Sequence, residues 1–168
     1  MSVLTGEAPP MKPARQGREK QVYNADGGRV VVGVVPIIPA TRQVVLVTSR
    51  KHTIEWLLPK GGWESDESQA ESATREAYEE AGISGRIGTP LQPLGTFPHT
   101  KTFPDSGLPT CDFVFFEMQV SELAPMWPEA SERDRQAFTY EAALGLLSNK
   151  PYMKDALQRC SLAPKIPP

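Results

Sequence analysis

Residues 61–83 read GGWESDESQAESATREAYEEAGI, and they contain the best-signalled helix of the chain. Ser68 and Glu71 form a capping box, in which the Ser68 hydroxyl accepts from the amide of Glu71 and the Glu71 side chain reaches back. Alanines recur on one face, and Gly82 is typical of the residue just beyond a helix end. The stretch therefore predicts a helix that begins after Ser68, packs closely on a sheet and ends before Gly82.

The rest of the chain contains short β-branched and apolar runs that predict a sheet. These runs are residues 29–35, 43–48, 55–58, 95–97, 112–120 and 137–140, and two closing helices are predicted over 141–147 and 151–160. Prolines and paired glycines separate the first three runs. Strands around one well-capped helix, with further helices at the end, predict a mixed α/β layered domain. We expect a flexible segment over residues 1–20, the domain over 21–162 and a short tail over 163–168.

Charge is distributed unevenly along the chain. Residues 64–80 contain seven acidic side chains and one basic one, so this stretch carries −6 while the remainder carries +4 toward the net charge of −2. A concentrated acidic patch in a mildly basic body suggests a cation site beside an anion site.

Glu76, Glu79 and Glu80 stand at positions i, i+3 and i+4, which places three carboxylates on one helix face. Like charges this close destabilise a bare helix, and a hard divalent cation such as Mg²⁺ or Mn²⁺ relieves the repulsion. Taken alone, the same spacing is more typical of a solvated acidic face. Arg75 is open to two partners, because Glu71 and Glu79 are both within reach on the same helix.

The spacing of the whole stretch decides between these interpretations. Gly61, Glu67 and residues 75–83 match the pattern G-x5-E-x7-R-E-U-x-E-E-x-G-U, where U is a bulky or aliphatic residue and Ala77 is a small choice. Seven fixed identities coincide by chance roughly once in 10⁸–10⁹ start points. The stretch resembles the catalytic box of the Nudix hydrolases, a family of metal-dependent enzymes that cleave phosphoanhydride bonds.

The resemblance implies an α/β/α sandwich with a mixed sheet and a loop-helix-loop catalytic box. It implies Glu76 and Glu80 as metal ligands, with the backbone carbonyl of Lys60 completing the shell around Mg²⁺, or Mn²⁺ in its place. Glu79 is expected to bind the metal or to orient and deprotonate the attacking water. Glu67 is expected to support the loop through Arg75, which acts as a clamp.

Outside the box the chain is similar to the diphosphoinositol polyphosphate phosphohydrolases, in their fungal form, over roughly residues 17–160. The motifs are GREKQVY (17–23), GRVV (28–31), WLLPKGG (56–62), WPE (127–129) and NKP (149–151). The resemblance implies removal of the β-phosphate from inositol pyrophosphates, with diadenosine polyphosphates and polyphosphate as further substrates. A dense polyanion needs basic side chains around the metal. The candidate substrate contacts are Arg29, Ser49, Arg50, Lys51, Lys60, Gly61, Gly62, His99, Lys101, Arg133 and Lys150.

Compared with these relatives, the chain has one extra residue before Trp56, which leaves Arg50 and Lys51 as alternatives for the same contact. The loop with His99 and Lys101 also differs in sequence from the basic loop of the relatives. Each basic residue, taken singly, is more typical of a solvated surface position. Trp56 and Trp63 are interpreted as packing or rim residues.

Two other functions remain open at this point. One is a nucleotide-specific Nudix enzyme acting on dinucleoside polyphosphates or ADP-ribose, and the other is a non-catalytic module that binds inositol phosphates. We expect a monomer acting on a small polyanion, with no membrane partner and with no nucleic-acid partner other than, at most, RNA caps. Cys111 and Cys160 are interpreted as ordinary thiols of a reducing compartment, which favours a cytoplasmic or nuclear protein. Secretion is expected only for a form from which a signal peptide has been removed.

Overall fold

The computed structural model describes residues 11–88 and 91–165. Its strands are β1 (Arg29–Ile38), β2 (Gln43–Thr48), β3 (Trp56–Leu57), β4 (Lys60–Gly62), β5 (Ile83–Ile87), β6 (Gly95–Pro98), β7 (Cys111–Leu123) and β8 (Arg135–Phe138). Its helices are α1 (Gln69–Ala81), α2 (Tyr140–Leu146) and α3 (Pro151–Gln158). Within these ranges, none of the helices has the length and apolar content needed to span a bilayer.

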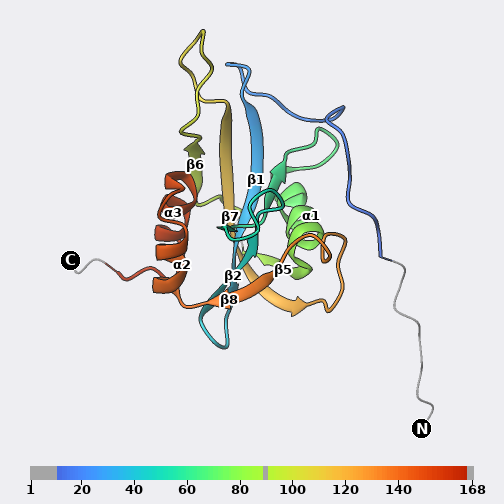
Figure 1. Ribbon diagram of the computed structural model, residues 1–168, viewed down its shortest axis with the longest axis vertical. Helices are drawn as coiled ribbons and strands as arrows, with labels where there is room; N and C mark the ends of the chain where they lie inside the picture. The colour runs from blue at the N-terminus through green and yellow to red at the C-terminus, as the bar shows by residue number, and fades with distance from the viewer. Residues whose placement is uncertain (1–10, 89–90, 166–168) are drawn as a thin grey trace.

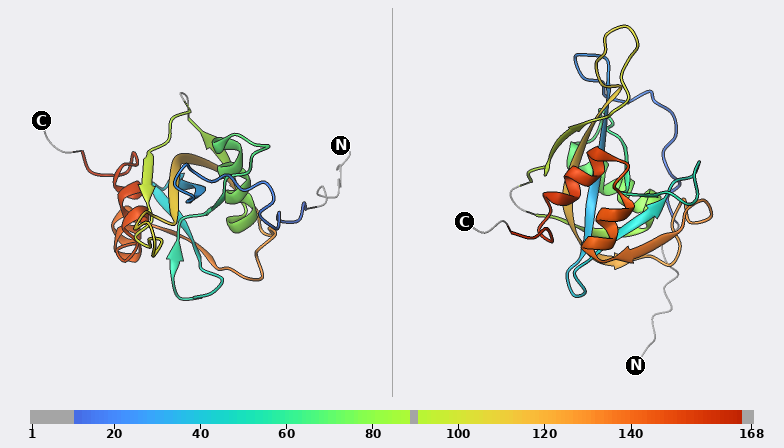
Figure 2. Two further views of the ribbon diagram at one scale, coloured as in Figure 1. Left: turned by 90° about the horizontal axis from the view of Figure 1, so that it is seen from above. Right: turned by 60° about the vertical axis from the view of Figure 1, so that its left-hand side comes forward.

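The described strands form one mixed sheet in the order β3-β2-β1-β7-β5, with β4 paired to β1, β6 to β7 and β8 to β2. The central pair, β1 and β7, is parallel, and the other pairs are antiparallel. Helix α1 lies on one face of the sheet, and α2 and α3 lie on the other (Figures 1 and 2). The predicted α/β/α sandwich with a mixed sheet is therefore confirmed.

Strand β1 is buried on both faces because its valines alternate between two cores. Val32 and Val34 pack with the alanine face of α1, whereas Val31 and Val35 pack with residues of α2 and α3. The valine run is continuous because β1 lies between two helical layers and is buried against both.

The predicted helix boundaries around α1 are confirmed. The Ser68 Oγ accepts from the Glu71 N–H at 3.1 Å, and the Ser68 N–H donates to Glu71 Oε1 at 3.2 Å. Gly82 ends the helix with φ 62°, a left-handed conformation that glycine adopts without steric cost.

Several predicted strand limits are wrong. β1 continues through Pro36 to Ile38, since pairing with β4 ends at Gly33 and pairing with β2 begins at Ile37. The Val34 N–H faces the edge of β1 that pairs with β4 and β2, and it bonds to the Pro59 carbonyl. Residue 36 faces the same edge, at a point between the two pairings, so the N–H that proline lacks is not needed as a donor there. The last predicted strand ends at Phe138, because Thr139 is the N-cap of α2.

Two strands were not predicted at all. β4 contains Gly61 and Gly62, and β5 contains Ser84 and Gly85, residue types with low strand propensity. The predicted division at residues 20 and 162 stays a prediction. Residues 1–10, 89–90 and 166–168 lie outside the described part of the chain.

Candidate active site

The site begins where β4 passes the middle of α1. Gly61 of β4 pairs with Val32 of β1, and the Glu76 carboxylate lies directly against the Gly61 backbone. A Cβ atom at position 61 would overlap that carboxylate. Glycine at this position is therefore what lets an acidic side chain of α1 reach the strand.

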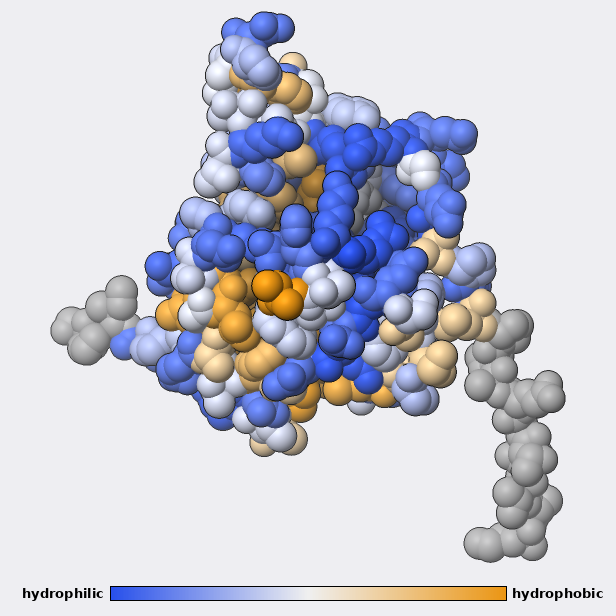
Figure 3. Space-filling view, in the orientation of Figure 1, coloured by the Kyte–Doolittle hydropathy of each residue, from blue (hydrophilic) through white to orange (hydrophobic). Residues whose placement is uncertain are grey.

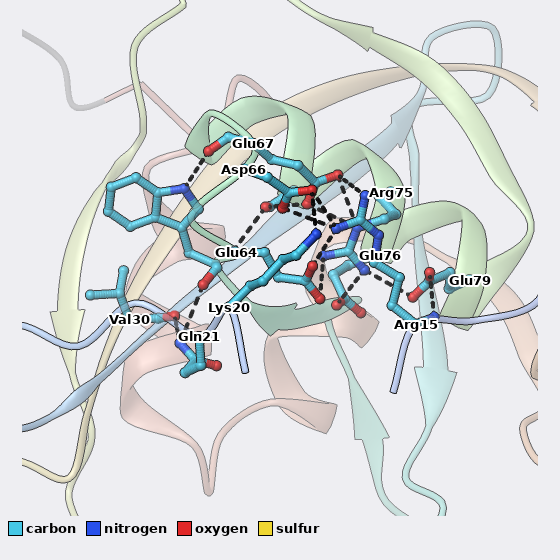
Figure 4. Close-up of polar contacts among 12 residues, drawn as sticks. Arg15, Lys20, Gln21, Val30, Glu64, Asp66, Glu67, Arg75, Glu76 and Glu79 are labelled. Atoms are coloured by element: carbon cyan, nitrogen blue, oxygen red, sulfur yellow. Dashed lines mark hydrogen bonds and ion pairs between the residues drawn. The ribbon is translucent and has the colours of Figure 1, made fainter. Parts of the chain in front are cut away.

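Arg75 is the clamp that the sequence predicted (Figure 4). Its Nε donates to both carboxylate oxygens of Glu67 at 3.0 and 3.1 Å. Its Nη1 donates to Glu76 Oε1 and to Glu79 Oε2, each at 3.1 Å. Arg75 thus pairs with Glu79 on its own helix and bridges the loop before α1 to the carboxylates on it.

Glu80 and Arg133 form a second, more buried ion pair. Arg133 Nη2 lies 3.3 Å from Glu80 Oε1, and the exposed fractions of the two side chains are 7% and 8%. The Lys60 N–H donates to Glu80 Oε2 at 3.1 Å, and the Trp127 indole donates to the Glu80 carbonyl at 2.9 Å. Glu80 is therefore fixed by β4 on one side and by the segment before β8 on the other.

Burial and mutual repulsion shift the ionisation of this group. Burial, followed by the negative charge of Glu80, raises the pKa of Glu76 to about 8. Burial and the same Glu80 charge also raise the pKa of Glu129, which pairs with Arg133. The carboxylates here are more numerous than the cationic groups that contact them. The carboxylate oxygens of Glu76, Glu79 and Glu80 are therefore suited to bind a divalent cation.

A tighter group of carboxylates lies beside this set. Glu64, Asp66 and Glu67 have oxygens within 4.8 Å of one another. Arg15, Lys20 and Arg75 already pair with them. We therefore assign the candidate metal site to Glu76, Glu79 and Glu80, whose negative charge is less completely neutralised.

A cleft of about 970 Å³ opens over these carboxylates. The predicted residues that it brings together are Arg29, Arg50, Lys60, Gly61, Gly62, Glu76, Glu79, Glu80 and Arg133. Figure 3 shows that hydrophilic side chains predominate on the side of the molecule where α1 lies. Acidic residues of α1 and basic residues from separate segments therefore line one cleft.

Arg50, and not Lys51, belongs to the cleft wall. Arg50 pairs with Glu129 and Glu132, each at 3.3 Å. Lys51 is exposed outside the wall, and its N–H donates to the Ser49 hydroxyl at 3.3 Å. Ser49 caps this turn, so neither Ser49 nor Lys51 lines the cleft.

Three further predicted contacts also lie outside the wall. The Lys150 ammonium pairs with Glu55 at 3.3 Å. His99 packs against the Tyr152 ring, with centroids 4.8 Å apart, and its Nδ1 accepts from the N–H of Lys101. Lys150 is the residue before α3, and His99 and Lys101 follow β6; none of the three is among the residues that line the cleft.

The sequence interpretation did not assign five charged residues of the wall to the site, namely Arg15, Arg18, Glu64, Glu129 and Glu132. Arg15 and Arg18 come from the segment assigned as flexible, and Glu129 and Glu132 pair with the cleft arginines. Arg18 and Glu129 lie in motifs already noted, GREKQVY and WPE, so a signal existed for them. Arg15 and Glu132 had none, because their partners are distant in sequence.

Comparison with known proteins identifies this arrangement. The family model described as NUDIX domain matches residues 27–160. The chain belongs to the Nudix family. Residues 61–83 are accordingly its Nudix box, and the predicted membership is confirmed.

Nudix relatives from a plant and from human are similar over most of the chain. Nudix hydrolase 21, chloroplastic, of Arabidopsis thaliana is 35% identical over 150 residues, covering 86% of this chain and 72% of the relative. Nudix hydrolase 16, mitochondrial, of the same plant is 35% identical over 161 residues, covering 86% and 85%. Diphosphoinositol polyphosphate phosphohydrolase 3-alpha of Homo sapiens is 31% identical over 123 residues, covering 71% and 70%. The predicted fungal form stays a prediction.

A solved Nudix structure supports the fold. The Nudix hydrolase from Nitrosomonas europaea has a TM-score of 0.62 at 20% identity and covers 79% of this chain and 87% of its own. Nudix hydrolases act on small phosphate-containing molecules and generally use divalent metals such as Mg²⁺, in agreement with the carboxylate set described above.

Proposed function

We propose that this Nudix hydrolase removes the β-phosphate from diphosphoinositol polyphosphates with the help of Mg²⁺, for which Mn²⁺ can substitute. We also propose diadenosine polyphosphates and polyphosphate as substrates. The observation that carries the proposal is the cleft in which the buried carboxylates of α1 lie among basic side chains from separate segments. Acidic groups suit a cation, and the surrounding bases suit a substrate with several phosphates.

The carboxylates of Glu76, Glu79 and Glu80 and the carbonyl of Lys60 would hold the metal. When bound, a divalent cation neutralises phosphate oxygens and lowers the pKa of a water molecule. Glu79 would accept the proton of the attacking water, since Arg75 holds its carboxylate at a fixed position. The water oxygen then bonds to the β-phosphorus as the anhydride P–O bond breaks, releasing orthophosphate and an inositol polyphosphate.

The basic residues would bind the remaining phosphates. Lys60 and Arg29 line the cleft without an ion pair among the described residues, so their charges are available to a substrate. Arg50 is more than half exposed and pairs with Glu129 and Glu132 at the rim. Its pair with Glu132 is exposed on both sides, so Arg50 can exchange that carboxylate for phosphate at little cost, because exposed ion pairs are weak.

The composition of the wall favours an inositol phosphate over a nucleotide. Within the described part of the chain, no aromatic side chain lines the cleft, so a nucleobase would find no ring to stack on. The similarity to the human diphosphoinositol polyphosphate phosphohydrolase favours the same substrate class.

The test is phosphate release from a diphosphoinositol pentakisphosphate with Mg²⁺, beside diadenosine hexaphosphate and ADP-ribose. We expect turnover of the inositol substrate that Glu80→Gln abolishes. Glu71→Gln is the matched control, because it removes an exposed acid of the same helix and glutamine preserves the capping box. Full activity of Glu80→Gln would refute the site, and activity on a nucleotide alone would refute the substrate class. If all three substrates are inert while the metal binds, the chain is a binding module.

A further inference from the structure

The segment before the first strand forms one side of the cleft. Residues 11 and 13–18 line the same cavity as Glu76, Glu79 and Glu80. Figure 4 shows Arg15 and Lys20 of this region directed toward the acidic side chains around α1. The sequence suggested a flexible lead-in, so these contacts need an explanation of their own.

Arg15 attaches the segment at its centre. Its guanidinium bonds to Glu64 and to Asp66, the latter at 3.1 Å, and lies 3.7 Å from Glu67. Its backbone N–H donates to Glu79 Oε1 at 3.0 Å. One residue therefore contacts both the loop before α1 and a carboxylate of the candidate metal site.

Lys20 attaches the segment a second time. Its ammonium lies 3.2 Å from Asp66, and its carbonyl accepts from the Ser65 N–H at 2.8 Å. The two attachments lie on either side of Arg18. They restrict the backbone there, which lowers the entropy that Arg18 would lose on binding a ligand.

Arg18 is the cation that these attachments leave free. It is exposed, it lines the cleft, and it has no ion pair among the residues that the structure describes. An unpaired guanidinium is suited to bidentate contact with phosphate. Arg15 differs, since its charge is already used on carboxylates.

We propose that residues 13–18 are a wall of the substrate cleft, in which Arg15 latches the segment to the acids before α1 and Arg18 binds a phosphate of the substrate. The inference rests on the proposed function, because it needs a ligand with several phosphates. Arg15 is a positioning residue that acts through Arg18. The opposite role, a strap that blocks Glu79, predicts that removing the latch increases activity.

The experiment compares Arg18→Ala, Arg18→Lys, Arg15→Ala and the double variant in the full chain. We expect Arg18→Ala to raise KM about tenfold with little change in kcat, since one exposed charge-assisted contact is lost. Arg18→Lys should recover part of the loss. Arg15→Ala should raise KM less, and the double variant should equal Arg18→Ala, because the latch acts through that side chain. Lys12→Ala is the matched control, a base of the same segment outside the wall, and should leave both constants unchanged.

Binding of inositol hexakisphosphate, which has no phosphoanhydride bond, separates the inference from the proposed function. If hydrolysis fails in the wild type but Arg18→Ala still weakens binding about tenfold, the proposed function is wrong and the wall is supported. A wild type that does not bind this probe overturns the inference. Equal affinities of wild type and Arg18→Ala also overturn it, as does a faster enzyme after Arg15→Ala.

Discussion

Replacing Arg133 by methionine tests whether the pair with Glu80 is a desolvated ion pair. The substitution keeps most of the side-chain volume but removes the cation from two carboxylates, at 3.3 Å from Glu80 and 3.4 Å from Glu129. It also removes the donor that bonds to the Thr48 carbonyl at 2.9 Å. Glu80 then remains largely buried without an opposite charge, and Glu129 retains its pair with the more exposed Arg50.

Breaking a buried pair by removing one partner costs about 3–5 kcal/mol. The separations in this pair are longer than ideal and the cleft is open to water, so we expect about 3 kcal/mol of lost unfolding free energy. Glu80→Gln in the Arg133→Met background should restore part of it, since it neutralises one stranded carboxylate. Saturating Mg²⁺ should also restore part of the lost unfolding free energy, because it supplies a replacement positive charge.

Urea unfolding at neutral pH, without and with Mg²⁺, measures these differences. Arg86→Met is the control, because Arg86 is exposed and has no ion pair among the described residues. A loss below about 1 kcal/mol for Arg133→Met would contradict the reasoning, since that is the range of a solvated surface pair. Additive effects of the two substitutions would contradict it as well.

Three further outcomes follow from the same contacts. Gly61→Ala should lower kcat by roughly 100-fold while unfolding changes little, because the new Cβ displaces the Glu76 carboxylate; unchanged kinetics would refute this. Without metal, unfolding free energy should fall as pH rises from 4.5 to about 8, because a carboxyl with a raised folded pKa binds more protons in the folded state; Glu76→Gln should flatten that slope. Gly82→Ala should cost about 1–2 kcal/mol in thermal unfolding, since φ is 62° and the new Cβ lies 3.0 Å from that of Trp127.

Local signals in the sequence were sufficient for α1 and its carboxylates. The cap at Ser68, the glycine at 82 and the spacing of Glu76, Glu79 and Glu80 all act within a few residues, so their structural meaning does not depend on the rest of the fold. The valine run of β1 was equally informative, because burial on both faces leaves no polar positions.

Contacts between residues far apart in the chain could not be predicted from the sequence. Nothing near Arg133 indicates that its guanidinium lies against Glu80, 53 residues away, and nothing near Arg15 indicates three acidic partners. The choice between Arg50 and Lys51 depends on which way one turn residue faces, and the carboxylates of Glu129 and Glu132 decide it. The basic residues were recognised, but only the assembled sheet determines which of them share a cleft.

The parallel pairing of the two central strands has a consequence for how the chain folds. Arg29 of β1 pairs with Cys111 of β7, and the register continues to Ile37 and Gln119. Most of the chain must therefore be synthesised before β1 and β7 can pair. Their pairing also requires the long stretch between them to lose conformational entropy as its ends come together. During translation the valine run of β1 emerges long before its partner, and we expect this stretch to be the segment most in need of protection from aggregation.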